Sequence, residues 1–334
     1  MRVEKKIGIL DANILYLIGA FLFIFLGSYV QMREILSGLL ITQIFIILIP
    51  PFLYLALKKV NIKRTMRLNK LSIKHGLLIV VITFLMYPVA VTANALGMLI
   101  LSLFGNLSIP QLPMPTEFMG YVKAMAVISL AAGICEEIFF RGFILTGYEK
   151  LGKRNAIIIS AILFGIFHLN IYNLLGPIVL GLVFGYFVVL TNSIYAGIIG
   201  HIVNNGIAVT LGFIMIKLQE ILQDYTEVAG ETSVELSTTQ TMLVSLLVFG
   251  FIAVITSTIA YFFARIIKRD IEGIEASYSP EKPYDFEEEL YIEANDLVNN
   301  DSKYGLFKYL PVVIVVAVFI FFAYIQITEI VRLG

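Results

Sequence analysis

The chain has 334 residues, of which 59% are hydrophobic and only 14% charged, and its 24 lysines and arginines balance its 24 aspartates and glutamates. Soluble domains of this size rarely approach a mean hydropathy of +0.89, and a net charge of zero gives no argument for nucleic acid as a partner. The single cysteine excludes an intrachain disulfide. Composition therefore predicts an integral membrane protein.

Continuous apolar runs recur along the chain, and many reach the roughly 20 residues that cross a bilayer core of about 30 Å. Because the runs do not alternate with polar residues, they predict helices, and the expected fold class is an all-α polytopic transmembrane bundle of about eight to nine spans. The nine expected spans are 13–31, 35–57, 76–104, 119–147, 155–170, 174–191, 194–216, 241–265 and 308–329. The first run lacks a small-residue cleavage site, which favours a retained helix over a signal peptide.

Lysine and arginine gather in alternate loops. They fill the N-terminal head, the loop after the second span, the turn after the fourth and the end of the eighth, whereas the opposite loop "GNLSIPQLPMPTEF" has none. The positive-inside rule then puts the N-terminus in the cytoplasm and the C-terminus outside. The expected location is a multi-pass position in the cell membrane.

The segment "AAGICEEIFFRGF" (131–143) places three ionisable side chains inside the fourth span. Each would cost about 2.5–3.5 kcal/mol at the centre of a membrane helix, so we expect them to face the bundle interior and to be paired. Glu137 and Arg141 lie four residues apart on one face and can form an ion pair. Glu136 lies about 100° round the helix and is less well placed to pair with Arg141, so it could serve a function other than this ion pair. The plainer alternative is that all three brace helix contacts.

The chain has only three histidines. His75, at the edge of the third span, is expected to be interfacial and solvated. His168 lies deep in the fifth span, and His201 lies in the seventh, where Asn205 shares its helical face and Asn204 is close. An interhelical hydrogen bond would explain either histidine alone. Their concentration with the glutamates and the arginine in three spans indicates a site.

These side chains support more than one chemistry. A carboxylate and an imidazole that converge on one water can act as general base, and a second imidazole with a carboxamide can stabilise an oxyanion, which suffices for amide hydrolysis. Glu136, His168 and His201 could also bind zinc with one position open, although the usual H-E-x-x-H spacing is absent. Cys135 is disfavoured as a nucleophile because the adjacent anion opposes a thiolate, and it is interpreted as a packing residue.

Three motifs follow one another about 30 residues apart: "EEIFFR", which holds Glu136, Glu137 and Arg141, then "FGIFH" (164–168), then "HIVNN" (201–205). In this order on successive membrane helices they resemble the CPBP (Abi-like) family of CAAX-processing and bacteriocin-processing intramembrane proteases, which includes the type II CAAX prenyl endopeptidases. The resemblance covers roughly 119–215. The first three spans fit it less specifically, and 267–334 looks like an extension.

The resemblance implies an intramembrane endopeptidase that hydrolyses a peptide bond of a membrane-embedded or membrane-associated peptide or protein. Glu136 would activate the attacking water together with His168, and His201 with Asn205 would stabilise the oxyanion. The supporting residues would be Glu137, Arg141, Phe164 and Asn204. No cofactor is expected, with zinc on Glu136, His168 and His201 as the alternative. From helix depth, we expect the cavity to open toward the basic loops.

Four regions are expected along the chain. They are N-terminal helices (1–118), the CPBP-type catalytic membrane core (119–216), an extracytoplasmic loop with the eighth span (217–266), and an acidic cytoplasmic segment with the final helix (267–334). The acidic stretch within 270–306 is interpreted as a solvated linker, with a substrate or partner docking element as the alternative.

A second class of function stays open. Buried carboxylates and histidines also form proton relays, so the alternative is a non-catalytic membrane scaffold or a proton-coupled transporter that uses the same cluster. Paired broken helices in an inverted repeat would favour a carrier, and the sequence has no evident repeat.

Overall fold

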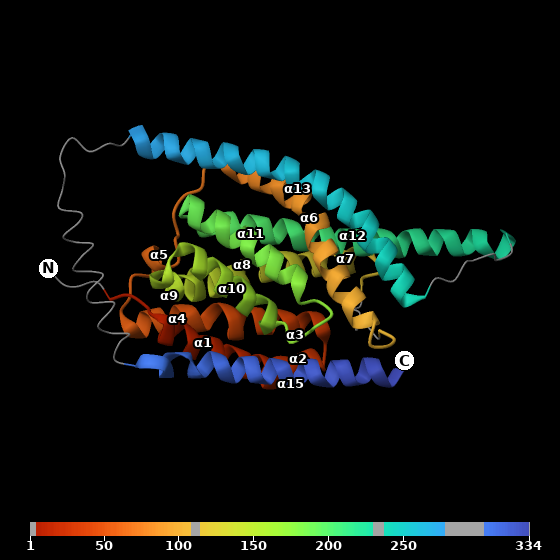
Figure 1. The fold of residues 1–334 in the computed structure, drawn as a ribbon, viewed down its shortest axis with the longest axis horizontal. Coiled ribbons are helices and arrows are strands. Elements are labelled where there is room, and N and C mark those ends of the chain that lie inside the picture. Colours follow the sequence, from red (N-terminus) through yellow and green to blue (C-terminus); the bar gives the residue numbers. More distant parts are fainter. Residues whose placement is uncertain (1–4, 108–113, 230–236, 278–303, 334) are drawn as a thin grey trace.

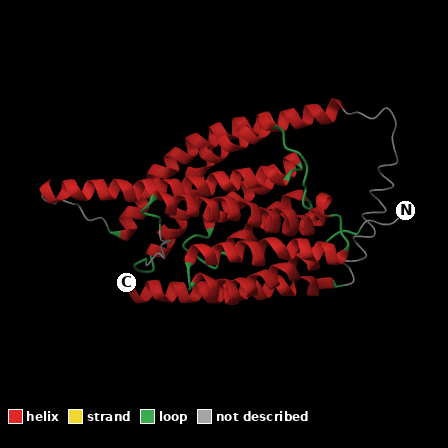
Figure 2. Cartoon of the chain, turned by 180° about the vertical axis from the view of Figure 1, so that it is seen from behind, coloured by secondary structure: helices red, strands yellow, loops and turns green. Residues whose placement is uncertain are grey.

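The computed structural model describes residues 5–107, 114–229, 237–277 and 304–333. Within these residues every regular element is a helix, which confirms the all-α bundle (Figures 1 and 2). Seven helices in the described part are long and apolar enough to cross a membrane: Ile9–Gln31, Ile35–Lys58, Ile73–Ser102, Phe118–Leu151, Ile194–Leu222, Thr238–Ile274 and Gly305–Leu333.

The other two expected spans, 155–170 and 174–191, are shorter helices. They are α10 (Lys153–Phe167) and α11 (Leu175–Thr191), with 15 and 17 residues. At 1.5 Å per residue they are about 22 and 26 Å long, less than the apolar core of a bilayer. The expected count of about eight to nine spans fits roughly, with seven long spans and this shorter pair. Because the two helices form one hairpin, the expected sides of the termini are the same whether or not the pair crosses.

Three spans contain π-helical turns, which place an extra residue in a turn and are common at functional sites. The first consists of α1 (Ile9–Leu22), η1 (Phe23–Gly27) and α2 (Ser28–Gln31). The second consists of α3 (Ile35–Ile41), η2 (Thr42–Leu48) and α4 (Ile49–Lys58). The fourth consists of α7 (Phe118–Ala124), η3 (Met125–Ala131), α8 (Ala132–Glu137), η4 (Ile138–Ile144), α9 (Leu145–Tyr148) and the 3₁₀ turn η5 (Glu149–Leu151).

The fourth span lies in the middle of the bundle, between two groups of helices. On one side α6 (Ile73–Ser102) and α12 (Ile194–Ala229) pack together, with α13 (Thr238–Ser277) along the outside of α6. On the other side α15 (Leu310–Leu333), which follows η6 (Gly305–Tyr309), packs along α1. Figure 1 shows α13 and α15 on opposite faces. The aromatic core around Phe139, Phe140 and Phe167 fills the space beside the fourth span.

The four basic loops lie at one end of the bundle. This end holds the first described residues, α5 (Ile62–Thr65), α9 and the C-terminal end of α13, on the left in Figure 1. The structure thus brings together the lysines and arginines that the positive-inside argument grouped.

Two local expectations change, and a third is not tested. The seventh span, expected to end at residue 216, continues as α12 to Ala229, so its polar end is helical. His75 is not solvated: it is buried between α6 and α13, with Nε2 3.3 Å from Asp270 Oδ2. Most of the acidic stretch lies outside the described residues, at 278–303, and its interpretation stays a prediction.

Candidate active site

The predicted ion pair between Glu137 and Arg141 is present and fully buried. Arg141 Nη1 lies 2.9 Å from Glu137 Oε1, and both side chains have no exposed surface. The guanidinium carbon also lies 4.4 Å from the centroid of the Phe164 ring and 5.9 Å from that of Phe184. The three guanidinium nitrogens have no partner with good hydrogen-bond geometry in the described residues, so charge attraction and the faces of the rings hold this cation.

Two glycines on neighbouring helices make room for the ion pair. A Cβ on Gly197 of α12 would lie 2.4 Å from Glu137 Oε2, and a Cβ on Gly181 of α11 would lie 3.2 Å from Arg141 Nη2. A side chain at position 197 would therefore displace Glu137, and one at position 181 would clash first with Ala161 of α10, at 2.8 Å, and crowd Arg141. The glycines thus let α11 and α12 approach the charges and exclude water from them.

His201 connects the two glutamates. Its Nδ1 lies 2.9 Å from Glu137 Oε1, and because an ionised carboxylate only accepts, Nδ1–H is the donor. Its Nε2 lies 3.7 Å from Glu136 Oε2. The ring stacks on Phe184 at a centroid distance of 5.5 Å and is buried. Glu137 therefore orients His201 as well as pairing with Arg141, which the spacing along one helix could not show.

Glu136 has a different environment from its neighbour. Its side chain is 16% exposed and faces a cavity rather than the ion pair. Gln43 Nε2, on η2, donates to Glu136 Oε1 at 2.6 Å. Sequence reasoning missed Gln43, although a carboxamide in the apolar run "ITQIFIIL" is the kind of buried polar residue that marks intramembrane sites.

His168 directly follows the last residue of α10, and a bond to that helix fixes its ring. Nδ1 lies 2.8 Å from the carbonyl oxygen of Phe164, which only accepts, so Nδ1 carries a proton. When the ring carries this one proton, Nε2 is a hydrogen-bond acceptor. The next residue, Leu169, has a left-handed φ of 51°. Gln326 of α15 holds this turn: its Nε2 donates to the Leu169 carbonyl and its Oε1 accepts from the Ile171 amide, both at 2.9 Å.

The two asparagines of α12 form a short chain of hydrogen bonds. Asn204 Nδ2 donates to Asn205 Oδ1 at 3.1 Å, and Asn205 Nδ2 donates to the Ile128 carbonyl at 2.9 Å. One N–H of Asn205 is therefore already used. Among the described residues, Asn204 Oδ1 and Gln43 Oε1 are buried acceptors without a partner.

A cavity of about 380 Å³ joins these groups. It is lined by the four predicted catalytic residues Glu136, His168, His201 and Asn205, and also by Phe164, Asn204 and Gln43. Glu137 and Arg141 lie behind this lining. The far wall includes Asn94, which bonds Asn173 and the Gly176 amide at the start of α11.

The side toward which this cavity opens stays a prediction. One lining residue, Asn173, belongs to the loop between α10 and α11. Figure 1 shows this loop at the end of the bundle opposite α5 and α9. At the basic end, the Ile194 amide donates to the Arg67 carbonyl at 2.9 Å.

The zinc alternative can be compared with this geometry. Glu136, His168 and His201 supply donor atoms of the right type. However, no three His, Cys, Asp or Glu side chains in the parts of the chain that the structure describes are arranged as a group that could hold a metal ion. His201 Nδ1 is bonded to Glu137, so a ligand would have to be Nε2.

The fold and the cavity define a class: a multi-pass helical membrane protein with ionisable and carboxamide side chains gathered inside its bundle. Residues 118–207 match the family model described as type II CAAX prenyl endopeptidase Rce1-like. The match confirms the resemblance to the CPBP family, supports a CAAX-type protease-like function in general, and contains every predicted site residue but not Gln43 or Gln326. No curated protein and no solved structure matches the chain.

Proposed function

We propose that the protein is an intramembrane endopeptidase that hydrolyses a peptide bond of a membrane-associated protein or peptide, with water activated by Glu136 and His168. One observation carries the proposal. Side chains from the second, third, fourth and seventh spans and from the α10–α11 hairpin, remote in sequence, line one cavity. Its lining includes one carboxylate, two imidazoles and five carboxamides.

The first step is activation of water. Glu136 Oε1 accepts from Gln43, which leaves Oε2 as the acceptor for a water proton. His168 offers the lone pair of Nε2, since its Nδ1–H donates a hydrogen bond to the Phe164 carbonyl oxygen. Either group can take the proton while the water oxygen attacks the carbonyl carbon. When the C–N bond breaks, the same proton goes to the leaving amine, so no other reactant is needed.

The tetrahedral intermediate needs donors for its oxyanion. We assign His201 to this role: Glu137 accepts its Nδ1–H and so orients the ring, which lines the cavity. Arg141 pairs with Glu137 behind it. Asn205 has one N–H left for this purpose, because the other is given to Ile128.

Peptide binding is supported by two acceptors. Gln43 Oε1 and Asn204 Oδ1 are buried on the cavity lining and lack a partner among the described residues. Backbone N–H groups of an extended substrate would match them. A volume of about 380 Å³ is within the usual range for ligand sites, about 300–1,000 Å³.

The test is cleavage of quenched peptides, including prenylated peptides with a C-terminal CAAX sequence, by the full chain purified in neutral detergent. Wild type and Glu136→Gln are compared with and without a zinc chelator. Cleavage that is lost in the variant and kept under chelation supports a glutamate-type peptidase. Cleavage lost in both supports zinc on Glu136, His168 and His201. Equal cleavage by wild type and variant contradicts the proposal.

A further inference from the structure

A second hollow lies at the basic end of the bundle, between the α10–α11 hairpin and the last turns of α13. It has a volume of about 960 Å³ and shares no lining residue with the candidate active site. Its walls come mainly from within 153–158 of α10, 182–192 at the end of α11 and 271–272 of α13, and we call it the hairpin groove. The proposed peptidase chemistry does not use this groove.

Two positive charges stand at the end of the groove nearest the basic loops. Lys153 and Arg154 are the first residues of α10, and both are exposed. Neither side chain has an ion pair or hydrogen bond with another of the described residues. Helix stability does not explain their position, because the first turn is the positive end of the helix dipole and disfavours cations. That turn has no acidic residue, so a bound anion would relieve the repulsion.

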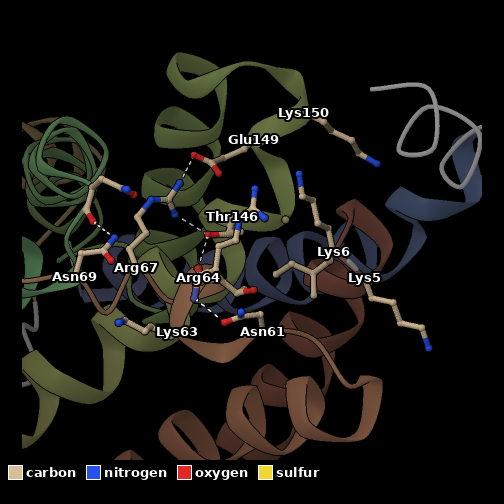
Figure 3. Close-up of a pocket in the computed structure, with 14 residues that line it drawn as sticks. Lys5, Lys6, Asn61, Lys63, Arg64, Arg67, Asn69, Thr146, Glu149 and Lys150 are labelled. Atoms are coloured by element: carbon tan, nitrogen blue, oxygen red, sulfur yellow. Dashed lines mark hydrogen bonds and ion pairs between the residues drawn. The ribbon is translucent and has the colours of Figure 1, made fainter. Parts of the chain in front are cut away.

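The other charged side chains of the lining are already paired. Arg67 forms an ion pair with Glu149 and donates to Thr146 Oγ1 at 2.7 Å, and Figure 3 shows its guanidinium directed at both partners. Glu272 Oε1 lies 3.5 Å from Lys268 Nζ, one turn back on the same helix. This pairing leaves the two cations of α10 as the charges of the described lining that a ligand can bind.

Beyond the cations the groove is apolar. Leu182, Tyr186 and Val189 follow one another at spacings of four and three residues on α11, so they share the face that lines the groove. At 1.5 Å per residue, Leu182 lies about 14 Å along α11 from the last residue, Thr191. Tyr186 and Ile158 of α10 are exposed, so the groove is open at its side, where the surroundings of a membrane protein are lipid.

The simpler explanation is that membrane proteins carry lysine and arginine at one end for topology alone. Lys59 and Lys70 fit that explanation, because they are exposed at the same end and do not line the groove. Lys153 and Arg154 differ because they stand at the end of a hollow whose remaining wall is mostly apolar. Topology requires positive charge at this end, but it does not require an apolar groove beside that charge.

We propose that the hairpin groove binds an anionic phospholipid from the leaflet at the basic end. Its phosphate would lie against Lys153 and Arg154, and the upper part of its acyl chains would lie along Ile158, Leu182 and Tyr186. The wall changes from charged to apolar in the same order as a phospholipid changes from headgroup to chains. A volume of about 960 Å³ is at the upper end of the usual range for ligand sites, about 300–1,000 Å³.

The test measures the Tm of the full chain in neutral detergent against the concentration of added ligand, because a ligand that binds only the folded state raises Tm. Dioctanoyl phosphatidylglycerol supplies charge and chains, dioctanoyl phosphatidylcholine supplies the same chains without net charge, and glycerol 3-phosphate supplies the charge alone. The groove variant is Lys153→Gln with Arg154→Gln. The matched control, Lys59→Gln with Lys70→Gln, removes the same charge from the same end outside the groove.

We expect phosphatidylglycerol to raise Tm saturably, at concentrations at least about tenfold below those that the other two probes need. Its half-maximal concentration should rise at least about tenfold in the groove variant and less than about twofold in the control, because each basic residue near an anionic headgroup changes affinity several-fold.

Four outcomes overturn the proposal. Equal stabilisation by phosphatidylcholine identifies general packing of lipid, and equal stabilisation by glycerol 3-phosphate identifies a phosphate site that does not use the apolar wall. Equal weakening in the two variants identifies an effect of net charge, and the fourth outcome is no stabilisation by phosphatidylglycerol. The readout needs no cleavage, so it is independent of the peptidase proposal.

Discussion

The candidate active site and the basic end of the bundle carry charge in opposite ways. In the active site, Glu137, Arg141 and His201 are buried, and Glu137 contacts the other two. At the basic end, Lys59, Lys70 and Arg269 are exposed. The difference follows from the surroundings. Inside a membrane an unpaired charge costs several kcal/mol, whereas solvent at the bundle end screens repulsion between lysines.

Within the active site, the two adjacent glutamates show the same contrast over one residue. Glu137 is enclosed by Arg141, His201 and Gly197. Glu136 faces the cavity and accepts one hydrogen bond from Gln43. A group that is fully paired is suited to holding structure, and a group with a lone pair toward a cavity is suited to chemistry. The predictions below test this division.

The largest expected effect is the loss of turnover in Glu136→Gln. The amide keeps the size of the side chain but cannot take a proton, so peptide cleavage should fall by at least about 10²-fold. Tm should change little, because the side chain makes one protein hydrogen bond at a partly exposed position. The control is Glu117→Gln, an exposed change at the start of the same span. Full activity in Glu136→Gln with loss in Glu137→Gln would reverse the two roles.

Breaking the buried pair should act on folding instead. Arg141→Ala leaves Glu137 charged and enclosed, and removing one partner of such a pair costs about 3–5 kcal/mol. The expected result is a large loss of Tm or of folded yield. The double variant Arg141→Met with Glu137→Gln removes both charges and should recover part of that loss. If the double variant is no more stable than Arg141→Ala, the pair does not account for the stability.

Gln43 offers a sharper comparison, because its described side-chain hydrogen bond goes to Glu136, the glutamate that lines the cavity. Gln43→Leu removes the donor to Glu136 Oε1, and the loss of a charged hydrogen bond of about 1.5 kcal/mol corresponds to roughly tenfold in rate. Gln31→Leu, which loses only a bond to Thr42, is the control and should leave the rate unchanged.

Part of this site could be predicted from the sequence. The order of the three motifs on successive helices, and the resemblance that it carries, predicted that Glu136, His168, His201 and Asn205 share a site. The i,i+4 spacing predicted the Glu137–Arg141 pair, because that contact lies within one helix. Spacing along the chain cannot predict contacts between helices. Such contacts include the hydrogen bond from His201 to Glu137, the close approach of Gly197 to Glu137, and the hydrogen bond from Gln43 to Glu136.

The same limit explains one error in the fold. The hydrophobic pattern predicted α10 and α11 but not their shorter length. His75 was expected in solvent because it lies beside Lys74 at the edge of a span, but α13, a helix remote in sequence, covers it.

The smallest expected effect tests such a remote contact. The final helix lies outside the matched family region, yet its Gln326 makes two hydrogen bonds to the turn that follows His168. Gln326→Ala should loosen that turn and let the imidazole lose its fixed direction, at a cost of about 1–3 kcal/mol in stability. We expect cleavage to fall a few-fold, with hydrogen exchange at Leu169–Ile171 rising in the variant. The control is Thr328→Ala on the same helix, which loses only a bond to the carbonyl of Ile325. If exchange rises equally in both variants, α15 supports the turn only through its general packing. If exchange rises only in Gln326→Ala, the hydrogen bonds of Gln326 hold the turn that positions His168.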